Sequence, residues 1–208
     1  MPRQERAART RRALIRAAAL VVAEQGYADA SLGAVSVRAG VSLGALHFHF
    51  ASKQDLAWAV DEAAAQAVDR IAQAAAASPD PLQQLVDSVF LLARGLLADP
   101  LLSAGFELGY SRYAVVPGAA RDAWALQVAE LTRRAHGAAG LGPGVSAGTA
   151  AETVLTMTAG LFVLGRTRAS WLADGHIATL LIALLPALAA PAALVRLRVS
   201  APECNRPE

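Results

Sequence analysis

The sequence predicts an all-α fold of nine helices, and two observations lead to this prediction. Apolar residues recur at three- and four-residue spacing over most of the 208 residues. Valine and isoleucine do not alternate with polar residues over any useful length, so no strand is expected. A chain of this length can form a core without disulfides, and its single cysteine, Cys204, suits a reducing cytoplasm.

Two short helices joined by a tight turn are the most informative element. They are expected at about residues 32–39 and 43–48, and each follows a serine, Ser31 or Ser42, that can cap it. Gly40 makes the turn between them. A helix-turn-helix unit of this kind places its second helix in the major groove of DNA.

A longer helix is expected on each side of this pair. The first runs from about residue 6 to 25, where the apolar residues share one face, and Gly26 ends it. The second begins with Ser52 and Asp55, an aspartate version of the capping box, and runs to about residue 77.

Five further helices follow, at about residues 81–98, 100–110, 119–136, 150–171 and 175–189. Asp80-Pro81 and Asp99-Pro100 each place an N-cap before a proline at the first helical position. The uncharged stretch Ile177–Val195 is long enough for a membrane span, and a helix buried in a core or a subunit interface explains it equally well. We favour the buried helix, because Pro186 and Pro191 interrupt the stretch, and we expect no membrane partner.

The net charge of +2 hides an asymmetry between the two parts of the chain. Residues 1–58 hold eight basic against four acidic side chains, whereas residues 59–208 hold eleven against thirteen. A basic head on a mildly acidic body is typical of a nucleic-acid-binding module joined to another domain, although a solvated charged helix gives the same balance. We predict a helix-turn-helix DNA-binding domain at 1–52, a ligand-binding and dimerisation domain at 53–200, and a disordered tail at 201–208.

Most residues expected to contact DNA are small, basic or hydroxyl-bearing. Gly44 lets the helix backbone approach the groove, hydroxyl and imidazole groups can donate to phosphates or bases, and basic side chains attract phosphates of any sequence. The predicted DNA-binding residues are Arg3, Arg6, Arg9, Arg11, Ser31, Ser42, Leu43, Gly44, Ala45, His47, His49 and Lys53. Phe48 and Phe50 are expected in the core. His47 and His49, two residues apart, point to opposite sides of a helix, so we predict no metal site.

The first sixty positions resemble the DNA-binding domain of TetR-type transcriptional regulators. The matching stretches are Thr10-Arg11, Ala17-Ala18, Glu24-Gln25-Gly26-Tyr27, Arg38-Ala39-Gly40-Val41-Ser42 and, most specifically, Gly44-Ala45-Leu46-His47-Phe48-His49-Phe50-Ala51-Ser52-Lys53-Gln54-Asp55-Leu56. Leu43 stands where many members have a polar or basic residue, and His47 stands where most have tyrosine. The resemblance implies a nine-helix TetR-type fold, a homodimer, and double-stranded operator DNA as the partner.

Within that family the chain looks most like the γ-butyrolactone receptors of antibiotic-producing actinobacteria. The similarity rests on the Phe48-His49-Phe50 run, on the segment from Leu82 to Asp99-Pro100, and on the spacing from Pro117 to Trp124. It implies a cytoplasmic repressor of antibiotic biosynthesis genes, released from a palindromic operator by a small apolar signal. A TetR-type regulator that senses an antibiotic or a biosynthetic intermediate fits the sequence as well. We expect no cofactor.

The C-terminal helices offer apolar side chains with a few polar groups, which is the lining that a signal pocket needs. In the resembled receptors a tryptophan at the position of Trp124 packs on the ligand, so Trp124 is the first candidate. The other predicted ligand-binding residues are Thr158, Gln66, Phe90, Phe106, Tyr110, Met157 and Phe162. Most of these could equally be core residues, and a threonine can bond to its own helix.

A hydrolase motif is present in the letters of the sequence. Gly144-Val145-Ser146-Ala147-Gly148 matches Gly-x-Ser-x-Gly, and Asp174 and His176 follow it. That motif requires a strand before it, whereas Gly142-Pro143 precedes it here, so Ser146 is expected to cap a helix. We predict a protein that is not an enzyme and has no catalytic residues. An esterase-like hydrolase using Ser146 is the remote alternative.

Overall fold

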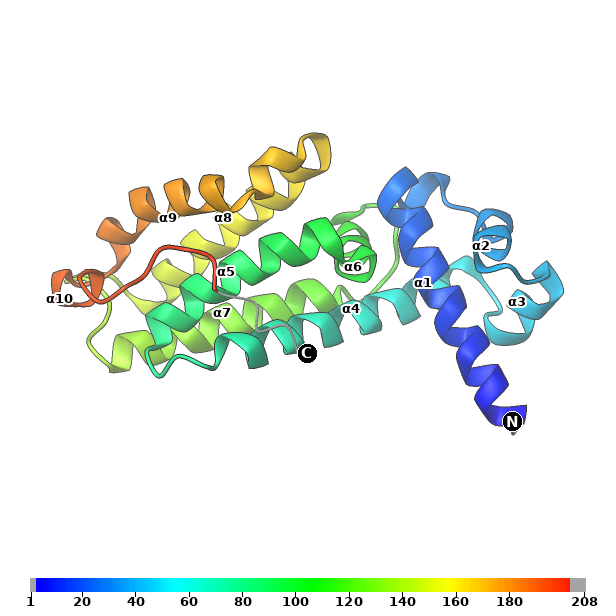
Figure 1. Ribbon diagram of the computed structural model, residues 1–208, viewed down its shortest axis with the longest axis horizontal. Helices are drawn as coiled ribbons and strands as arrows, with labels where there is room; N and C mark the ends of the chain where they lie inside the picture. The colour runs from blue at the N-terminus through cyan, green and yellow to red at the C-terminus, as the bar shows by residue number, and fades with distance from the viewer. Residues whose placement is uncertain (1–2, 203–208) are drawn as a thin grey trace. The chain divides into compact units, whose positions relative to one another are not determined.

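The structure is a computed structural model that describes residues 3–202. Within these residues the chain forms ten α-helices and one 3₁₀-helix, and β-structure is limited to an isolated antiparallel bridge between Leu141 and Ala189. The all-α prediction is therefore confirmed (Figure 1). The elements are α1 Arg3–Asp29, α2 Leu32–Ala39, α3 Leu43–His49, α4 Lys53–Ala75, α5 Pro81–Ala98, α6 Pro100–Tyr110, α7 Ala119–Gly137, α8 Ala147–Thr167, η1 Ala169–Leu172, α9 Asp174–Leu188 and α10 Pro191–Leu194.

The described chain divides into two compact units. Unit 1 takes in the chain up to Val68 together with Asp99–Ala123, and unit 2 takes in Asp69–Ala98 together with the chain from Trp124 on. The divisions fall inside α4 and α7, so these two helices contribute to both units. Unit 1 thus contains the predicted helix-turn-helix, the first part of α4, and α6. The functional boundary between residues 52 and 53 stays a prediction.

Unit 1 is built around α1, which packs against α2 and α6. The predicted N-caps are confirmed, because the Ser31 hydroxyl accepts the Ala34 N–H at 3.1 Å and the Ser42 hydroxyl accepts the Ala45 N–H at 3.1 Å. Gly40 closes α2 in the left-handed conformation, with φ 66°, which glycine adopts without strain. The buried core includes Leu14, Val21, Val35, Leu46, Phe50 and Val60.

The first helix differs from the prediction at its C-terminal end. Gly26 interrupts the helix with φ 79° and ψ 160°, as its position suggested, but the chain resumes a helical turn and α1 ends at Asp29. Helix α1 begins at Arg3, three residues before the predicted start. The side chain of Arg3 lies outside the described part of the structure.

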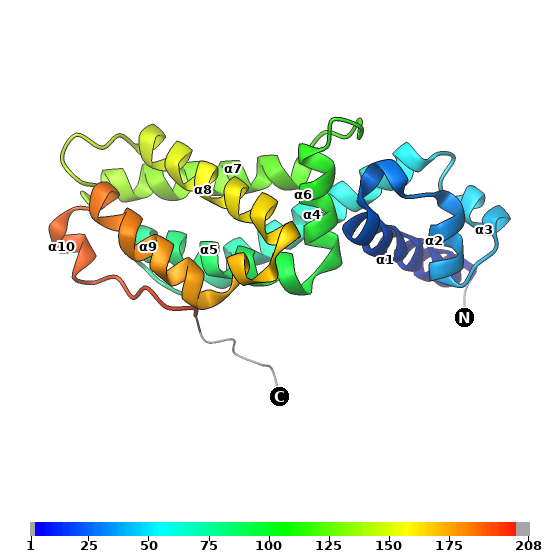
Figure 2. The ribbon, with the colours of Figure 1, turned by 90° about the horizontal axis from the view of Figure 1, so that it is seen from above.

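In unit 2, α5 packs against α8, α9 and η1, and both ribbon views show α8 and α9 running side by side (Figures 1 and 2). The helix predicted to reach residue 171 ends at Thr167, because Arg168 is extended before η1 begins. The nine-helix prediction also missed α10. After α9 the chain pairs with a loop, where the Ala190 N–H donates to the Gly140 carbonyl at 2.8 Å, and Pro191 then starts the new helix.

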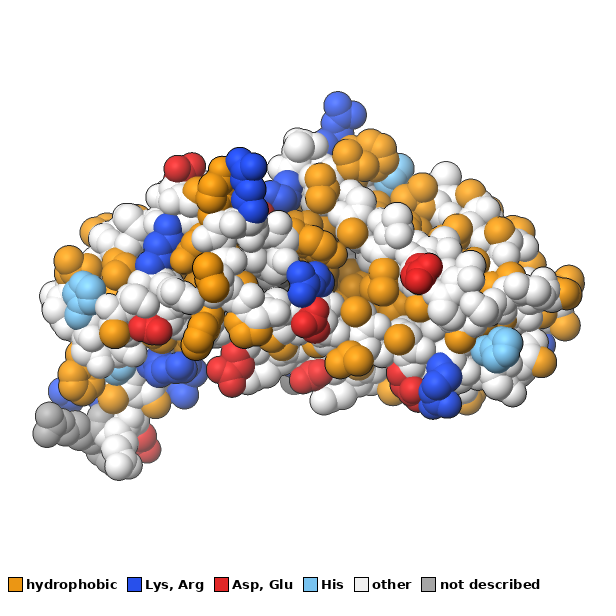
Figure 3. Space-filling model, turned by 180° about the vertical axis from the view of Figure 1, so that it is seen from behind, with side chains coloured by type: hydrophobic (Ala, Val, Ile, Leu, Met, Phe, Trp, Pro, Cys, Tyr) orange, Lys and Arg blue, Asp and Glu red, His pale blue; other side chains and the backbone are white. Residues whose placement is uncertain are grey.

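The stretch Ile177–Val195 is consequently not one long helix. Its larger part, α9, has 15 residues and buries Ile177, Leu181 and Leu185 on one side. By length and composition α8 could cross a membrane, but core helices of soluble proteins pass the same test, and 33% of its most apolar window is buried. Figure 3 shows hydrophobic side chains spread over unit 2 with few charged ones among them. The exposed large hydrophobic residues of this unit are Leu97, Leu126, Val163, Leu164, Ile182 and Val195.

Two residues of the predicted disordered tail are placed. Ala201 and Pro202 are half-buried, and the Pro202 carbonyl accepts a hydrogen bond from the Arg94 guanidinium at 3.0 Å. The rest of that tail, 203–208 with Cys204, lies outside the described residues.

Candidate nucleic-acid interface and sensor core

One side of α3 is open to solvent, and we call its four residues the reading face. They are Leu43, Gly44, His47 and Phe48, and all four are exposed. On the other side of the helix, Leu46 and Phe50 are 0% and 4% exposed and hold α3 on the core of unit 1. The short helix therefore presents a continuous face that could enter a groove.

Of the two phenylalanines expected in the core, Phe48 and Phe50, only one is buried. Phe50 is buried as expected, but the prediction of Phe48 as a core residue is wrong, because its side chain is 79% exposed. Leu46 and Phe50 are four residues apart and share the buried side, so a residue midway between them must point away. The Phe48 ring meets the His49 ring edge-on, with 5.2 Å between the ring centroids.

The remaining predicted DNA contacts on the helix-turn-helix are at the helix starts. The hydroxyls of Ser31 and Ser42 cap α2 and α3, so each bonds a backbone N–H and fixes where its helix begins. Ala45 and His49 are partly buried beside the reading face. The structure thus brings Ser42, Leu43, Gly44 and His47 together at one helix and its cap.

The basic side chains of α1 fall into two groups. Arg9, Arg12 and Arg16 are exposed and share the face opposite the buried Leu14 and Val21, and Arg6 is exposed one turn before them. Arg11 points elsewhere, with its guanidinium carbon 5.2 Å from the centre of the Phe50 ring. Arg11 therefore contributes a cation–π contact to the core side of α3 in addition to its charge.

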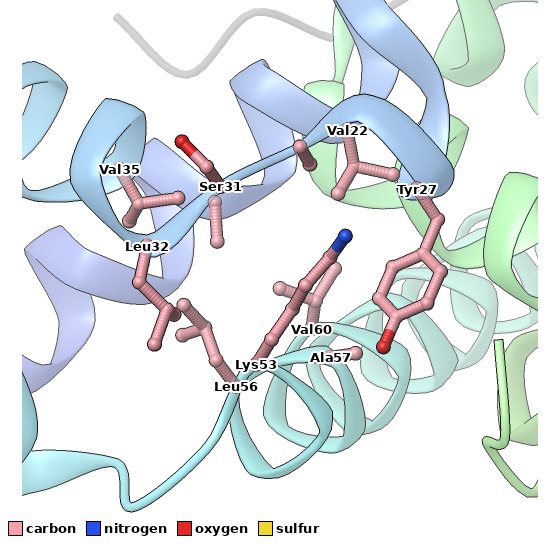
Figure 4. A pocket seen from close by; sticks show the side chains of 11 residues that line it. Val22, Tyr27, Ser31, Leu32, Val35, Lys53, Leu56, Ala57 and Val60 are labelled. Carbon is pink, nitrogen blue, oxygen red and sulfur yellow. The ribbon is translucent and has the colours of Figure 1, made fainter.

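Lys53 does not extend freely into solvent. Its ammonium donates to the Ala28 carbonyl at 3.1 Å and lies 4.4 Å from the centre of the Tyr27 ring. Figure 4 shows the side chain in a crevice lined mainly by apolar residues of α1, α2 and α4. Burial lowers the pKa of Lys53, and the charge of Asp29 opposes this shift. The crevice has a volume of about 20 Å³, close to the space that one water molecule needs.

A buried carboxylate in unit 1 was missed by sequence reasoning. Asp61 is 1% exposed, and its oxygens accept the backbone N–H groups of Gly118, Ala119 and Ala120 at 2.9, 2.8 and 3.2 Å. It therefore caps the N-terminus of α7 from α4, where unpaired N–H groups and the helix dipole favour an anion. The sequence does contain a sign of this burial, because Asp61 lies on the same side of its helix as the buried residues Ala57, Ala64 and Val68.

We use the name sensor core for the buried part of unit 2 around Trp124, Thr158 and Ser88. Trp124 is the residue that the sequence singled out first for ligand binding. Trp124 on α7 is 1% exposed, and its indole N–H donates to the Thr158 hydroxyl on α8 at 3.0 Å. The same hydroxyl donates back to the Val154 carbonyl at 3.0 Å. Trp124 and Thr158, which the sequence singled out separately, are thus a bonded pair, and the pair fixes the indole ring between two helices.

A second polar pair lies next along α7. The Gln127 amide donates to the Ser88 hydroxyl at 2.9 Å, while its carbonyl oxygen is buried without a hydrogen-bond partner among the described residues. Ser88 is 0% exposed. Sequence reasoning missed both residues, because a glutamine and a serine in separate helices give no pairing signal.

The other predicted ligand-binding residues divide between the units. Phe90 and Phe162 are buried and Met157 is partly buried in unit 2. Unit 1 holds Phe106, Tyr110 and Gln66, of which Phe106 is 1% exposed, Tyr110 is 44% exposed and Gln66 is exposed. Burial raises the pKa of Tyr110, against the opposing charge of Arg121.

The predicted ligand-binding residues line none of the cavities described here. An apolar cavity between α5, α8 and α9 has a volume of only about 10 Å³. A cavity of about 500 Å³ lies beneath the C-terminal segment and is lined in part by polar residues such as Gln83, Asp87 and Ser200. Ligand pockets usually offer several hundred Å³, whereas the Trp124 side chain is 1% exposed and closely packed by its neighbours.

The hydrolase motif has a structural role. Ser146 accepts the Thr149 N–H at 3.0 Å and is the N-cap of α8, as predicted. Asp174 forms an ion pair with Arg94, 2.8 Å between nitrogen and oxygen, and the His176 ring packs edge-on against Trp171.

Comparisons with known proteins agree with this geometry. The model of the tetR family of bacterial regulatory proteins matches residues 14–60, which include the helix-turn-helix. A TetR regulator from Streptomyces fradiae, TylP, is 32% identical, with a TM-score of 0.73 over 96% of this chain and 88% of that chain. A γ-butyrolactone receptor described as ArpA-like is 26% identical, with a TM-score of 0.75 over 92% of this chain and 94% of that chain.

The A-factor receptor protein of Streptomyces griseus is 36% identical over 108 residues. This stretch is 52% of the chain and spans 37% of the length of that receptor. The exposed α3, the family match and the nearly full-length similarities lead to one assignment. The chain belongs to the TetR family of bacterial transcriptional regulators, and within that family it is similar to γ-butyrolactone receptors of the actinobacterial autoregulator type.

Proposed function

We propose that the protein is a ligand-responsive repressor that binds a palindromic operator as a homodimer and is released by a small apolar signal. The observation that carries this proposal is the reading face of α3, which is exposed although two of its four residues are large and apolar. A soluble protein that exposes such side chains on a helix-turn-helix has a use for them in binding. We also propose that it acts in the cytoplasm on antibiotic biosynthesis genes, as the resemblance to γ-butyrolactone receptors implies.

The dimer would form through α8 and α9. Val163, Leu164 and Ile182 on these helices are 57%, 41% and 60% exposed, which suits a face covered by a second copy. Two α3 helices would then be set about one DNA turn apart, near 34 Å. Light scattering tests this part: Ile182→Glu should give monomers, whereas Leu126→Glu, at an exposed apolar residue of α7, should leave the dimer intact. A wild-type monomer at micromolar concentration would contradict it.

Release by the signal is a population shift. A ligand that fits only the arrangement with the wrong spacing between the two α3 helices moves the equilibrium away from DNA binding. Changing a 99:1 mixture into 1:99 requires about 10⁴-fold differential affinity, or about 5.5 kcal/mol. The buried Trp124–Thr158 pair supports a sensor here, since an apolar signal with one or two polar atoms would engage the indole and the hydroxyl together.

A gel-shift titration tests DNA binding and release together. The DNA is the region upstream of the chain's own gene, and the candidate signals are butyrolactones, furans and locally produced antibiotics. His47→Glu places a negative charge on the reading face and should abolish the shift, while His136→Glu, the same change at an exposed position of α7, should not. Failure of the wild type to bind this DNA or any palindromic promoter would overturn the repressor proposal.

The same titration separates the candidate signals. Thr158→Val should weaken the response to the active signal, whereas Thr153→Val should not, because the Thr153 hydroxyl bonds its own helix at the Thr149 carbonyl. Release by an antibiotic or biosynthetic intermediate, but not by a butyrolactone, would favour the alternative sensor. We also propose that the protein catalyses no reaction; an ester hydrolysis lost in Ser146→Ala would contradict this.

A further inference from the structure

The chemistry of α3 is unusual for a helix that reads bases. Its seven residues, Leu43–His49, include no lysine, arginine, asparagine, glutamine, aspartate or glutamate. On the reading face Leu43 is 46% exposed and Phe48 is 79% exposed. His47 is the one side chain of this face that carries hydrogen-bonding atoms. The groups that distinguish guanine or adenine by paired hydrogen bonds are therefore missing from α3.

Apolar side chains can still distinguish bases in the major groove. Thymine alone among the four bases carries a methyl group at C5, and this methyl projects into the groove where leucine and phenylalanine can contact it. We infer that Leu43 and Phe48 read the C5-methyl groups of thymines, so that sequence preference in this protein comes mainly from apolar contacts. This inference rests on the proposed function, because it names the feature of the operator that α3 recognises.

The positions of the two residues on α3 support contacts with bases. Leu43 is the first residue of α3, directly after the Ser42 cap, and the N-terminal residues of a recognition helix are the ones that reach base edges. Phe48 is supported by its edge-on contact with His49. We therefore expect the larger effect from Leu43 and a smaller one from Phe48 nearer the C-terminal end.

Charge and sequence reading are separated in this domain. The arginines of α1 supply attraction to phosphates that is independent of sequence. Overall affinity for DNA should therefore fall as the salt concentration rises. Removal of a C5-methyl group should weaken binding by the same factor at low and at moderate salt. Cytosine methylated at C5 presents a methyl group at the same place in the groove, so it should substitute in part for thymine.

The experiment starts with the full-length wild-type protein and a pool of duplexes with a randomised 30-base-pair centre. Enriched sites are synthesised with each thymine replaced singly by uracil, which removes only the C5-methyl group. Loss of one buried methyl should weaken binding roughly fourfold, and symmetric replacement in both half-sites roughly fifteenfold. Leu43→Ala should bind thymine and uracil duplexes at one contacted position almost equally, and Phe48→Ala should do so at another.

Val37→Ala is the matched control, since Val37 is 82% exposed on α2 and lies off the reading face. Replacement of a contacted thymine by uracil should weaken DNA binding by this variant as much as it weakens binding by the wild type. Thermal melting of each variant checks folding, and all three substitutions are at exposed positions.

The outcomes distinguish the two proposals. If no sequence is enriched, the repressor proposal fails and this inference fails with it. If sites are enriched but every uracil replacement is silent, or Leu43→Ala and Phe48→Ala keep the full uracil effect, DNA binding stands and methyl reading is wrong.

Discussion

The reading face of α3 exposes apolar side chains, whereas the sensor core of unit 2 buries polar ones. Leu43 and Phe48 stand in solvent, while Thr158 and Ser88 are 3% and 0% exposed among hydrophobic residues. Each arrangement costs free energy relative to the usual partition of residues, so each indicates a use beyond folding. Substitutions should therefore change DNA binding but hardly stability in the first region, and stability together with signal response in the second.

The largest expected effect is in the sensor core. Trp124→Ala removes a side chain that is 1% exposed and leaves a cavity between α7 and α8, so it should lower the free energy of unfolding by about 3–5 kcal/mol. Urea denaturation followed by circular dichroism measures this loss. Trp124→Phe keeps most of the volume and should cost clearly less. Equal losses in the two variants would mean that packing is not what the indole supplies.

Asp61 tests whether a buried polar group also contributes to the free energy of unfolding in unit 1. Asp61→Ala leaves three N–H groups at the start of α7 without their acceptor and should cost about 2–4 kcal/mol in urea denaturation. Asp61→Asn keeps one acceptor oxygen and should cost roughly half as much. If the alanine variant unfolds at the wild-type urea concentration, the capping of α7 by this carboxylate carries no stability.

Thr158→Val isolates the hydrogen bond from the packing. The two side chains have nearly the same shape, so the variant loses the acceptor of the Trp124 indole N–H and should be destabilised by about 1–2 kcal/mol. Thr153→Val, on the same helix, should cost under about 0.5 kcal/mol because the Thr153 hydroxyl is more accessible and bonds only locally. If Thr153→Val loses more unfolding free energy than Thr158→Val, the hydrogen bond between Trp124 and Thr158 does not account for the stability of this core.

Truncation of the reading face should barely change stability. Leu43→Ala and Phe48→Ala each remove side-chain atoms that already contact water, so unfolding free energies should stay within about 0.5 kcal/mol of the wild type. Affinity for DNA should fall in the same variants. A stability loss comparable to that of Trp124→Ala would show that these side chains belong to the core and would break the comparison.

The smallest effect concerns pH and the surface of unit 1. The Arg38 guanidinium lowers the pKa of Glu24 below its usual 4.5 through a hydrogen bond, and the oxygen–nitrogen distances are 2.8 and 2.6 Å. Because the folded-state pKa is depressed, the stability from this pair is present above pH 4.5 and is lost as the pH falls through the lowered value. Glu24→Gln should therefore differ slightly from the wild type at neutral pH and coincide with it in acid. A difference that grows in acid would contradict this sign.

Local signals predicted most of the helix starts. Ser31, Ser42 and Ser146 cap their helices, and Asp80 and Asp99 accept the N–H two residues on, at 2.9 Å in each case. These bonds join residues two or three apart, so the sequence contains both partners. Helix ends were less predictable, since α1 continues past Gly26 to Asp29 and α8 ends at Thr167 rather than near residue 171.

The candidate site was predictable in position but not in detail. The sequence placed the reading helix at the correct residues, yet it assigned Phe48 to the core and gave no sign of the contacts that Lys53 makes within the domain. A seven-residue helix is too short for its periodicity to show which aromatic faces inward, and Lys53 binds Ala28 and Tyr27, which are 25 and 26 positions away in the chain.

The sequence by itself determined the all-α class, the helix starts and the helix-turn-helix, because these depend on interactions between residues close together in the chain. Only the tertiary structure decided which side of α3 faces solvent, that Asp61 caps α7, and that Trp124 bonds to Thr158. Those contacts join residues 34 to 59 positions apart, and their geometry depends on how whole helices pack.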